Sequence, residues 1–189
     1  SIPYFSPVVT IILTLMGHRP AKFPWKYDEN DPQCVELKAV LARQIEKLAA
    51  AGVTDFFTGM ALGVDTWAAI AVLDLRERNP AIKFHCVLPC EGQETKWSTS
   101  AQVRYRDILR EADSVEYVKR TYDRKCMLER NQRLVDSAAL LLAVYNGEKR
   151  GGTAATVRYA QKAGREIIVI DPITLSVSHG KTALSPAHL

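Results

Sequence analysis

Two glycines four residues apart, followed by an aspartate, stand in the segment "TGMALGVD" at residues 58–65. Gly59 permits a sharp exit from a preceding strand, and Gly63 lets the following helix approach closely. Free N–H groups at the start of that helix would favour a phosphate, but the carboxylate of Asp65 would compete with the anion for the same helix dipole. Asp65 therefore fits better as a cap or as an acceptor for ribose hydroxyls. The segment is either a structural turn or the floor of a phosphate-binding site, and these residues alone leave both interpretations open.

A second candidate for phosphate chemistry is the segment "YNGEKRGGT", which ends at Thr153. The paired Gly151 and Gly152 expose backbone donors, and the Thr153 hydroxyl can cap a helix or bind a phosphate oxygen. Lys149 and Arg150 add positive charge beside them. The segment has no GxxxxGK[ST] pattern, so a P-loop ATPase is a poor fit. Ligand binding is the favoured interpretation, and a loop with a capping threonine is the alternative.

The segment "GHRP" begins at Gly17, which turns the chain after an apolar run. Arg19 offers a planar fork of five N–H donors, which suits an anionic ligand, and Pro20 stiffens the chain just after it. A lone arginine in a loop is otherwise solvated. His18 is a further candidate ligand residue, although an imidazole also serves in packing or capping.

The segment "RKCMLERNQRLVDSA" places a polar residue, Asn131, on the apolar side of a predicted helix. The apolar positions of this helix are Met127, Leu128, Leu134, Val135 and Ala138. An unsatisfied buried amide costs about 1–3 kcal/mol, so Asn131 needs a partner. Asn131 either bonds a loop carbonyl, or it lies with Arg130 beneath the ligand loops. Both interpretations stay open.

The order of elements along the chain determines where these segments lie. Short apolar runs at 8–16, 54–57, 82–88, 114–118, 139–145 and 166–170 alternate with helical patterns at 32–50, 64–79, 100–112, 124–137 and 153–164. This alternation predicts an α/β fold of the Rossmann-like, doubly wound type, with a mainly parallel sheet and helices on both faces. Ligands of such sheets bind beyond the carboxyl ends of the strands, so we expect the three glycine-containing loops to line one cleft. A single domain is predicted over 1–171, followed by a C-terminal tail over 172–189.

Composition limits the classes of function. The 189 residues carry a net charge of only +4, which permits an anionic ligand without indicating a nucleic-acid stripe. The four cysteines form no CxxC pair, so no metal site is predicted and a reducing cytoplasmic location is expected. The apolar run at 8–16 is too short to span a bilayer, so we expect no membrane association.

Trp67 follows Asp65 in a helix rich in Ala, Val, Ile and Leu. A helix of this composition is mostly buried, so packing in the core or at a dimer interface is favoured over stacking on a base. The tryptophan is therefore not counted among the ligand residues.

The segments "GHRP", "TGMALGVDTWAA", "ERNQRLVDSA" and "GGT", in this order, resemble the YpsA-like family of the SLOG superfamily. The resemblance runs from Thr10 to Asp171, and it departs from the family where Met16 replaces a more usual threonine. It implies a Rossmann-like pocket for a nucleotide or nucleotide-derived ligand, often in a homodimer. No cofactor is firmly implied beyond such a nucleotide or ADP-ribose-like molecule.

The same superfamily includes the Lonely Guy phosphoribohydrolases, whose glycine-rich segment carries a glutamate that acts with an upstream arginine. The resemblance places Thr156 at the position of that glutamate and aligns Arg130 with the arginine. A threonine cannot act as a carboxylate base, so hydrolysis by that route is not expected. Asp65 and Glu129 are the remaining candidates for a catalytic carboxylate.

Three functions therefore stand as hypotheses. The first is a sensor or accessory domain that binds a nucleotide-type small molecule, and the second is a nucleotide N-glycosidase or phosphoribohydrolase. The third is binding of single-stranded DNA, by analogy with DNA-processing protein A of the same superfamily. Trp25 and Tyr27 would supply the aromatic groups for it, whereas the weak net charge argues against it, and nucleic acid is not favoured.

Overall fold

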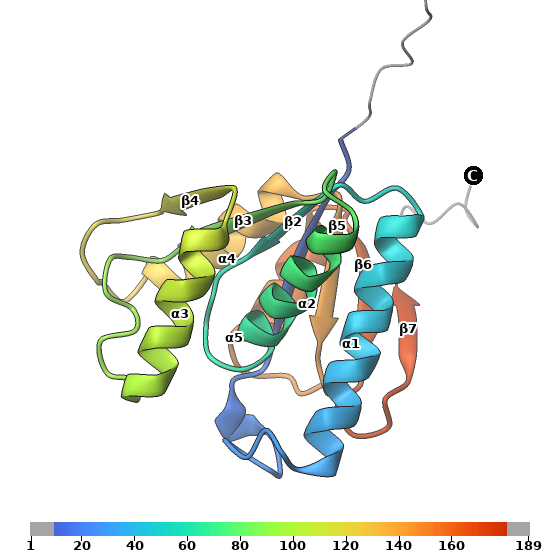
Figure 1. Cartoon of the computed structure of the whole chain (residues 1–189), viewed down its shortest axis with the longest axis horizontal. Coiled ribbons are helices and arrows are strands. Elements are labelled where there is room, and N and C mark those ends of the chain that lie inside the picture. Colours follow the sequence, from blue (N-terminus) through green and yellow to red (C-terminus); the bar gives the residue numbers. More distant parts are fainter. Residues whose placement is uncertain (1–9, 181–189) are drawn as a thin grey trace, which may run out of the picture.

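The computed structural model describes residues 10–180, in which strands and helices alternate around a seven-stranded sheet (Figure 1). The strands are β1 (Ile12–Gly17), β2 (Asp55–Thr58), β3 (Lys83–Leu88), β4 (Ser114–Tyr117), β5 (Leu140–Val144), β6 (Glu166–Ile170) and β7 (Val177–Gly180). The helices are α1 (Pro32–Ala50), α2 (Val64–Arg78), α3 (Thr99–Glu111), α4 (Cys126–Ser137) and α5 (Gly152–Lys162), with a 3-10 turn η1 (Pro20–Lys22).

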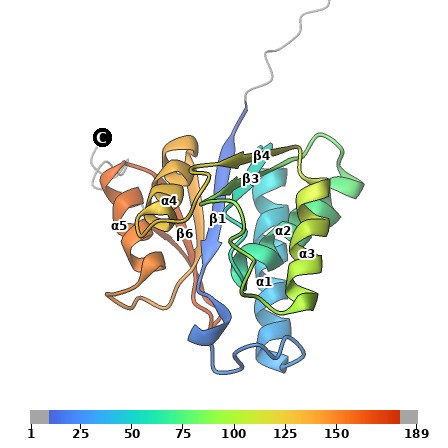
Figure 2. The same cartoon turned by 90° about the vertical axis from the view of Figure 1, so that its left-hand side faces the viewer.

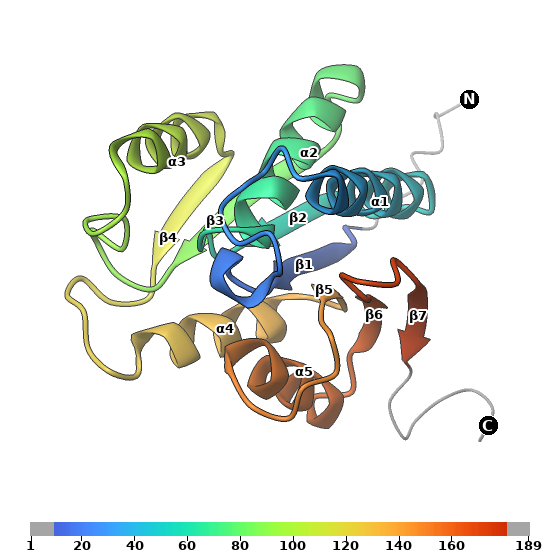
Figure 3. The ribbon, with the colours of Figure 1, turned by 90° about the horizontal axis from the view of Figure 1, so that it is seen from below.

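The strand order is β4-β3-β2-β1-β5-β6-β7, and every neighbouring pair is parallel except β6 and β7. Helices α1, α2 and α3 cover one face of the sheet, and α4 and α5 cover the other (Figure 2). Strands β2, β3 and β4 are added in turn on one side of β1, and β5, β6 and β7 are added on its other side, so the strand order changes direction at β1. This arrangement confirms the predicted Rossmann-like, doubly wound fold. Figure 3 looks onto the edge where the parallel strands end.

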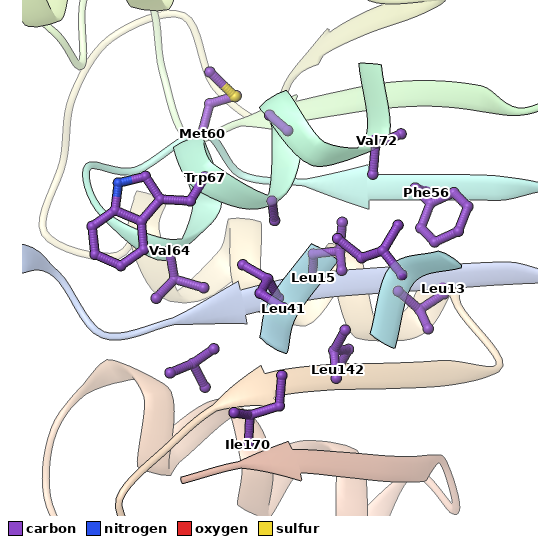
Figure 4. Packing of buried hydrophobic residues seen from close by; sticks show 14 of the residues in the cluster. Leu13, Leu15, Leu41, Phe56, Met60, Val64, Trp67, Val72, Leu142 and Ile170 are labelled. Carbon is purple, nitrogen blue, oxygen red and sulfur yellow. The ribbon is translucent and has the colours of Figure 1, made fainter. Parts of the chain in front are cut away.

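The core forms because the central strands are apolar on both faces. Leu13 and Leu15 of β1 are fully buried and pack with Phe56 and Leu41 on the side of α1 and α2 (Figure 4). A smaller cluster on the other face joins β5 to α4 and α5 and contains Leu141. Each such side chain contributes about 1.5–3 kcal/mol relative to an exposed position.

Trp67 belongs to this core. Only 4% of the residue is exposed, and its ring stacks on Phe23 at a centroid distance of 5.7 Å. Phe23 in turn stacks on Trp25 at 4.8 Å. The three rings fasten the segment after β1 onto α2, which confirms the predicted packing role of Trp67.

The starts of the helices differ in a way that bears on the site. The Asp31 carboxylate accepts the Gln33 N–H at the start of α1 (2.8 Å), and the Ser98 hydroxyl accepts the Ala101 N–H at the start of α3 (3.3 Å). In contrast, α2, α4 and α5 begin without a side-chain cap. The first N–H groups of α2 and α5 are therefore available to other acceptors, whereas the Cys126 N–H of α4 already donates to the Asp123 carbonyl oxygen at 3.4 Å.

The sequence analysis expected a C-terminal tail from residue 172, but residues 177–180 are a strand. They form β7, which pairs antiparallel with Ile167–Ile170 of β6. The sequence did not indicate this strand because "VSHG" has no alternation of apolar and polar residues, and pairing with β6 fixes it. The remaining part of the predicted tail, 181–189, and the first two residues of the apolar run at 8–16 lie outside the described residues. Across residues 10–180, no helix combines the length and the apolar character that a bilayer crossing requires.

Candidate functional site

A cavity of about 230 Å³ opens at the carboxyl edge of the sheet, where β1 and β5 end. Residues 17–19 reach it from the loop after β1, and Asp65 reaches it from the first turn of α2. Arg130 and Asn131 reach it from α4, and residues 151–153 reach it from the start of α5. The structure thus brings together every predicted ligand residue except Gly59 and Gly63. This is the convergence that a parallel sheet imposes on loops following its strands.

The start of α5 presents backbone donors to the cavity. Gly151, the residue before the helix, has a φ of 104°, a conformation that glycine adopts without strain. A Cβ added at Gly152 would meet no atom within 4 Å, so the space beside the first residue of the helix is open, whereas a Cβ at Gly151 would lie 3.8 Å from Oε1 of Glu148. An uncapped helix start with open space beside it is a favourable place for a phosphate or carboxylate group.

The predicted ligand residues Gly59 and Gly63 do not line the cavity. They leave room for residues that do, Arg130 and His18. A Cβ at Gly59 would lie 2.4 Å from Nη1 of Arg130, so this glycine makes room for the arginine. Gly63 has a φ of 88°, and a Cβ there would lie 2.9 Å from the carbonyl oxygen of His18. The backbone after β2 turns at Met60, whose φ is 57°, rather than at Gly59.

Asp65 and Arg130 form the charged floor of the cavity. Burial raises the pKa of Asp65 to about 6, although the positive charge of Arg130 and a hydrogen bond from the Ala61 N–H (3.0 Å) oppose the shift. Burial lowers the pKa of Arg130, and the charge of Asp65 opposes that shift. Only 5% of Asp65 and 4% of Arg130 are exposed. Each charge therefore offsets part of the free-energy cost of burying the other.

The Arg130 guanidinium is held by two short hydrogen bonds. Its Nη1 donates to the carbonyl oxygen of Gly59, and its Nε donates to Oδ1 of Asn131, both at 2.7 Å. The amide of Asn131 thus pairs with the neighbouring arginine instead of a loop carbonyl. Asn131 orients the guanidinium while itself lining the cavity.

The raised pKa of Asp65 predicts a pH dependence of folding stability. Because the folded pKa is about 6 and the ordinary value is 3.8, the folded protein binds the proton more tightly than the unfolded chain does. The contribution of Asp65 to stability is therefore fully present below pH 3.8 and is lost as the pH rises through 6. Between about pH 4.5 and pH 7 we expect wild type to lose about 2 kcal/mol relative to Asp65→Asn. Urea unfolding of both proteins at both pH values measures this, and parallel pH curves would refute the raised pKa.

His18 supports the mouth of the cavity as a neutral group. Burial lowers its pKa, and its Nε2 accepts the backbone N–H of Asn146 at 3.3 Å. Its Nδ1 lies 3.8 Å from Oε1 of Glu148. The same Oε1 lies 3.1 Å from Nζ of Lys22, but the geometry of that ion pair does not make a hydrogen bond. His18 thus links the loop after β1 to the loop after β5.

Sequence reasoning missed Glu148 and Lys22, which both line the cavity. Lys149 and Arg150, the charges that the sequence analysis emphasised in the same loop, are exposed and do not line it. The local turn decides this: the Asn146 side chain accepts the Glu148 N–H at 3.0 Å, which directs the carboxylate inward. An asparagine two residues before a polar side chain was the available signal.

The other candidate for a catalytic carboxylate, Glu129, lies in a different place from Asp65, and so does Thr156, the residue at the position of the Lonely Guy glutamate. Glu129 lies outside the cavity lining and pairs with Lys119 at 3.1 Å. The Thr156 hydroxyl is buried and donates to the carbonyl oxygen of Gly152 at 2.8 Å. Among residues 10–180, no three His, Cys, Asp or Glu side chains are grouped as a metal would require. Asp65 and Glu148 are the acids that reach the cavity.

Comparison with known proteins shows similarity over most of the chain. The model of a family described as the YspA SLOG family (YpsA) matches residues 13–175. A UPF0398 protein of Halalkalibacterium halodurans is 30% identical over 153 residues, which cover 80% of each chain. One from Bacillus pumilus is 27% identical over 79% of this chain and 81% of its own. One from Shouchella clausii is 38% identical over 61% of this chain and 63% of its own.

Proposed function

Because the chain belongs to the YspA SLOG family, we propose that its cavity binds a nucleotide or a nucleotide-derived molecule of the ADP-ribose type. The protein then acts as a cytoplasmic sensor or accessory domain, as a homodimer. The observation that supports this most is the meeting of an uncapped helix start with Arg19, Arg130 and Asp65 in one cavity. These groups complement the two polar parts of a nucleotide, its phosphate and its sugar.

In this proposal, the phosphate lies at the start of α5. The N–H groups of Gly152 and Thr153 donate to its oxygens, and so does the guanidinium of Arg19, which lines the same cavity. Arg19 is exposed, and within residues 10–180 its guanidinium makes one hydrogen bond, from Nη2 to the sulfur of Met127 at 4.0 Å, so it is available to an anion.

The sugar lies against Asp65. With a pKa of about 6, this carboxylate is mostly ionised at pH 7 and accepts hydrogen bonds from ribose hydroxyls. One ribose phosphate fills much of a cavity of about 230 Å³, so the base lies toward the mouth.

Replacement of Arg19 tests the phosphate contact. Its charge-assisted hydrogen bond is worth about 1.5–3 kcal/mol, so Arg19→Ala should weaken a phosphate-bearing ligand by roughly tenfold to a hundredfold. Because the side chain is exposed, the melting temperature should not change. Calorimetric titration with AMP and ADP-ribose measures the loss, and adenosine is the control because it lacks phosphate. Equal weakening of adenosine and AMP would contradict the assignment of Arg19 to phosphate.

A nucleotide N-glycosidase or phosphoribohydrolase is the alternative, and the environment of Asp65 favours it. A buried carboxylate with a raised pKa is suited to acid-base chemistry, whereas Glu129 faces Lys119 and Thr156 has no carboxylate. Incubation of wild type and Asp65→Asn with nucleoside monophosphates, with chromatography for free base, decides between the two. We expect no release from wild type. Release that Asp65→Asn abolishes would replace the sensor by the hydrolase.

Binding of single-stranded DNA receives less support. The Trp25 ring is buried against Phe23, so it offers no platform to a base, and Tyr27 is the exposed aromatic of that pair. Proteins that bind single-stranded nucleic acid usually combine a basic groove with several aromatic side chains on which the bases stack.

A further inference from the structure

Three side chains with complementary chemistry meet at the end of the sheet opposite the cavity. Asp55 and Ser114 are the first residues of β2 and β4, and His85 lies on β3 between them. His85 is directly opposite Ser114 in the β3–β4 register. Phe56 and Phe84 pack into the core on the side of α1 and α2, so the alternation of strand residues turns Asp55 and His85 to the other face.

The three groups form a continuous chain of hydrogen bonds. Nε2 of His85 lies 2.7 Å from Oδ2 of Asp55, and its Nδ1 lies 2.6 Å from the hydroxyl oxygen of Ser114. An ionised carboxylate can only accept a hydrogen bond, so in the neutral imidazole the hydrogen is on Nε2, which donates a hydrogen bond to Asp55. The lone pair of Nδ1 then faces the Ser114 hydroxyl, which is the arrangement of a general base and its nucleophile.

The histidine ring is held in place from two further sides. The Thr54 hydroxyl donates to the second carboxylate oxygen of Asp55 at 2.7 Å, which fixes the carboxylate. The ring of Phe57 stacks on His85 at a centroid distance of 4.5 Å and an interplanar angle of 24°. Solvent nevertheless reaches the group, because Ser114 is exposed and the side chains of His85 and Asp55 are 17% and 18% exposed.

We propose that Ser114 is a nucleophile for small activated carboxylic esters or thioesters, with His85 as its general base and Asp55 as the residue that positions the base. The Ser114 oxygen attacks the carbonyl carbon, and its proton passes to Nδ1 of His85. The bond from the carbonyl carbon to the alcohol or thiol breaks, and His85 returns the proton to that leaving group. Water then attacks the acyl-serine with His85 again as base, which releases a carboxylic acid and restores the serine.

The edge position of β4 supplies a donor for the negative oxygen that forms in these steps. The Asp113 N–H bonds the Phe84 carbonyl oxygen on β3, at 2.8 Å. Because successive N–H groups of a strand point in opposite directions, the N–H of Ser114 points away from β3, and β4 is the last strand of the described sheet on that side. The backbone N–H of the nucleophile itself can therefore stabilise the oxyanion.

A fluorophosphonate probe tests the proposal, because it bonds covalently to an activated serine with loss of fluoride. The experiment measures the intact mass of the full chain over time and locates the label by peptide mapping. We expect one label, on Ser114, that Ser114→Ala removes. His85→Gln should slow the labelling by about a hundredfold, the usual contribution of a general base, and Asp55→Asn should also slow it.

Ser100→Ala is the matched control, because Ser100 is an exposed serine whose hydroxyl bonds Ser98 rather than a histidine. Its loss should leave the labelling rate unchanged. Circular dichroism of the His85→Gln variant separates a lost base from a lost fold. Labelling of Ser114 no faster than that of Ser100, or labelling that folded His85→Gln retains, would overturn the proposal.

Discussion

Gly152→Asp is expected to abolish nucleotide binding while the protein stays folded. A carboxylate at the first position of α5 would face the proposed phosphate across open space, since nothing lies within 4 Å of a Cβ at this glycine. Two unit charges about 4 Å apart near a protein surface repel by about 4 kcal/mol, so affinity should fall by at least about a hundredfold. The same carboxylate stabilises the helix by roughly 0.3–1 kcal/mol, because it complements the helix dipole. Stability and affinity should therefore change in opposite directions.

Gly152→Ala is the control for this variant. It adds a Cβ in the same open space without a charge, so affinity and stability should stay close to those of wild type. Calorimetric titration with AMP and thermal unfolding of the three proteins give both quantities. Unchanged affinity in Gly152→Asp would show that the phosphate does not lie at the start of α5.

Arg130→Met is expected to destabilise the protein by about 3 kcal/mol at pH 7, the lower end of the range for a buried pair that loses one partner. The Gly59 carbonyl oxygen keeps a second donor, the Gln93 amide at 3.1 Å, so the cost falls mainly on Asp65, which loses the charge that compensates it. Methionine fills much of the volume of the arginine stem. At about pH 4.5, where Asp65 is protonated, the loss should be smaller.

The double variant Asp65→Asn/Arg130→Met isolates the coupling between the two charges. With the carboxylate removed, the Arg130→Met change should cost less than it does in wild type at pH 7. Urea unfolding of the four proteins of this cycle measures the coupling energy. If Arg130→Met cost as much in the Asp65→Asn background as in wild type, the two buried charges would not compensate each other.

The sequence predicts the sheet well where burial leaves a simple pattern. Strands such as β5 and β6 are apolar on both faces because helices cover both sides, and their runs mark them clearly. β7 lies at the edge, mostly exposed, and gains its structure from hydrogen bonds to β6 rather than from its own composition. Such a strand leaves no periodic signal for a sequence analysis to find.

The candidate site follows the same logic. The positions of Arg19 and Gly152 at the cavity could be predicted because both follow strands, and the loops after the strands of a parallel sheet meet at one edge. Glu148 could not be placed, because a single turn at Asn146 decides which side chain of its loop faces inward. Gly59 shows a further limit, since its role depends on the guanidinium of Arg130, which comes from a helix 71 residues later.

Native mass spectrometry tests the central claim, that the cavity holds a nucleotide-type ligand, most directly. Wild type and Gly152→Asp are purified from cells without added ligand and then mixed with AMP, ADP-ribose or adenosine. We predict that wild type retains or takes up one phosphate-bearing nucleotide per chain, and that Gly152→Asp carries none. Absence of any nucleotide from wild type in both preparations, or equal occupancy in the two proteins, would contradict this claim.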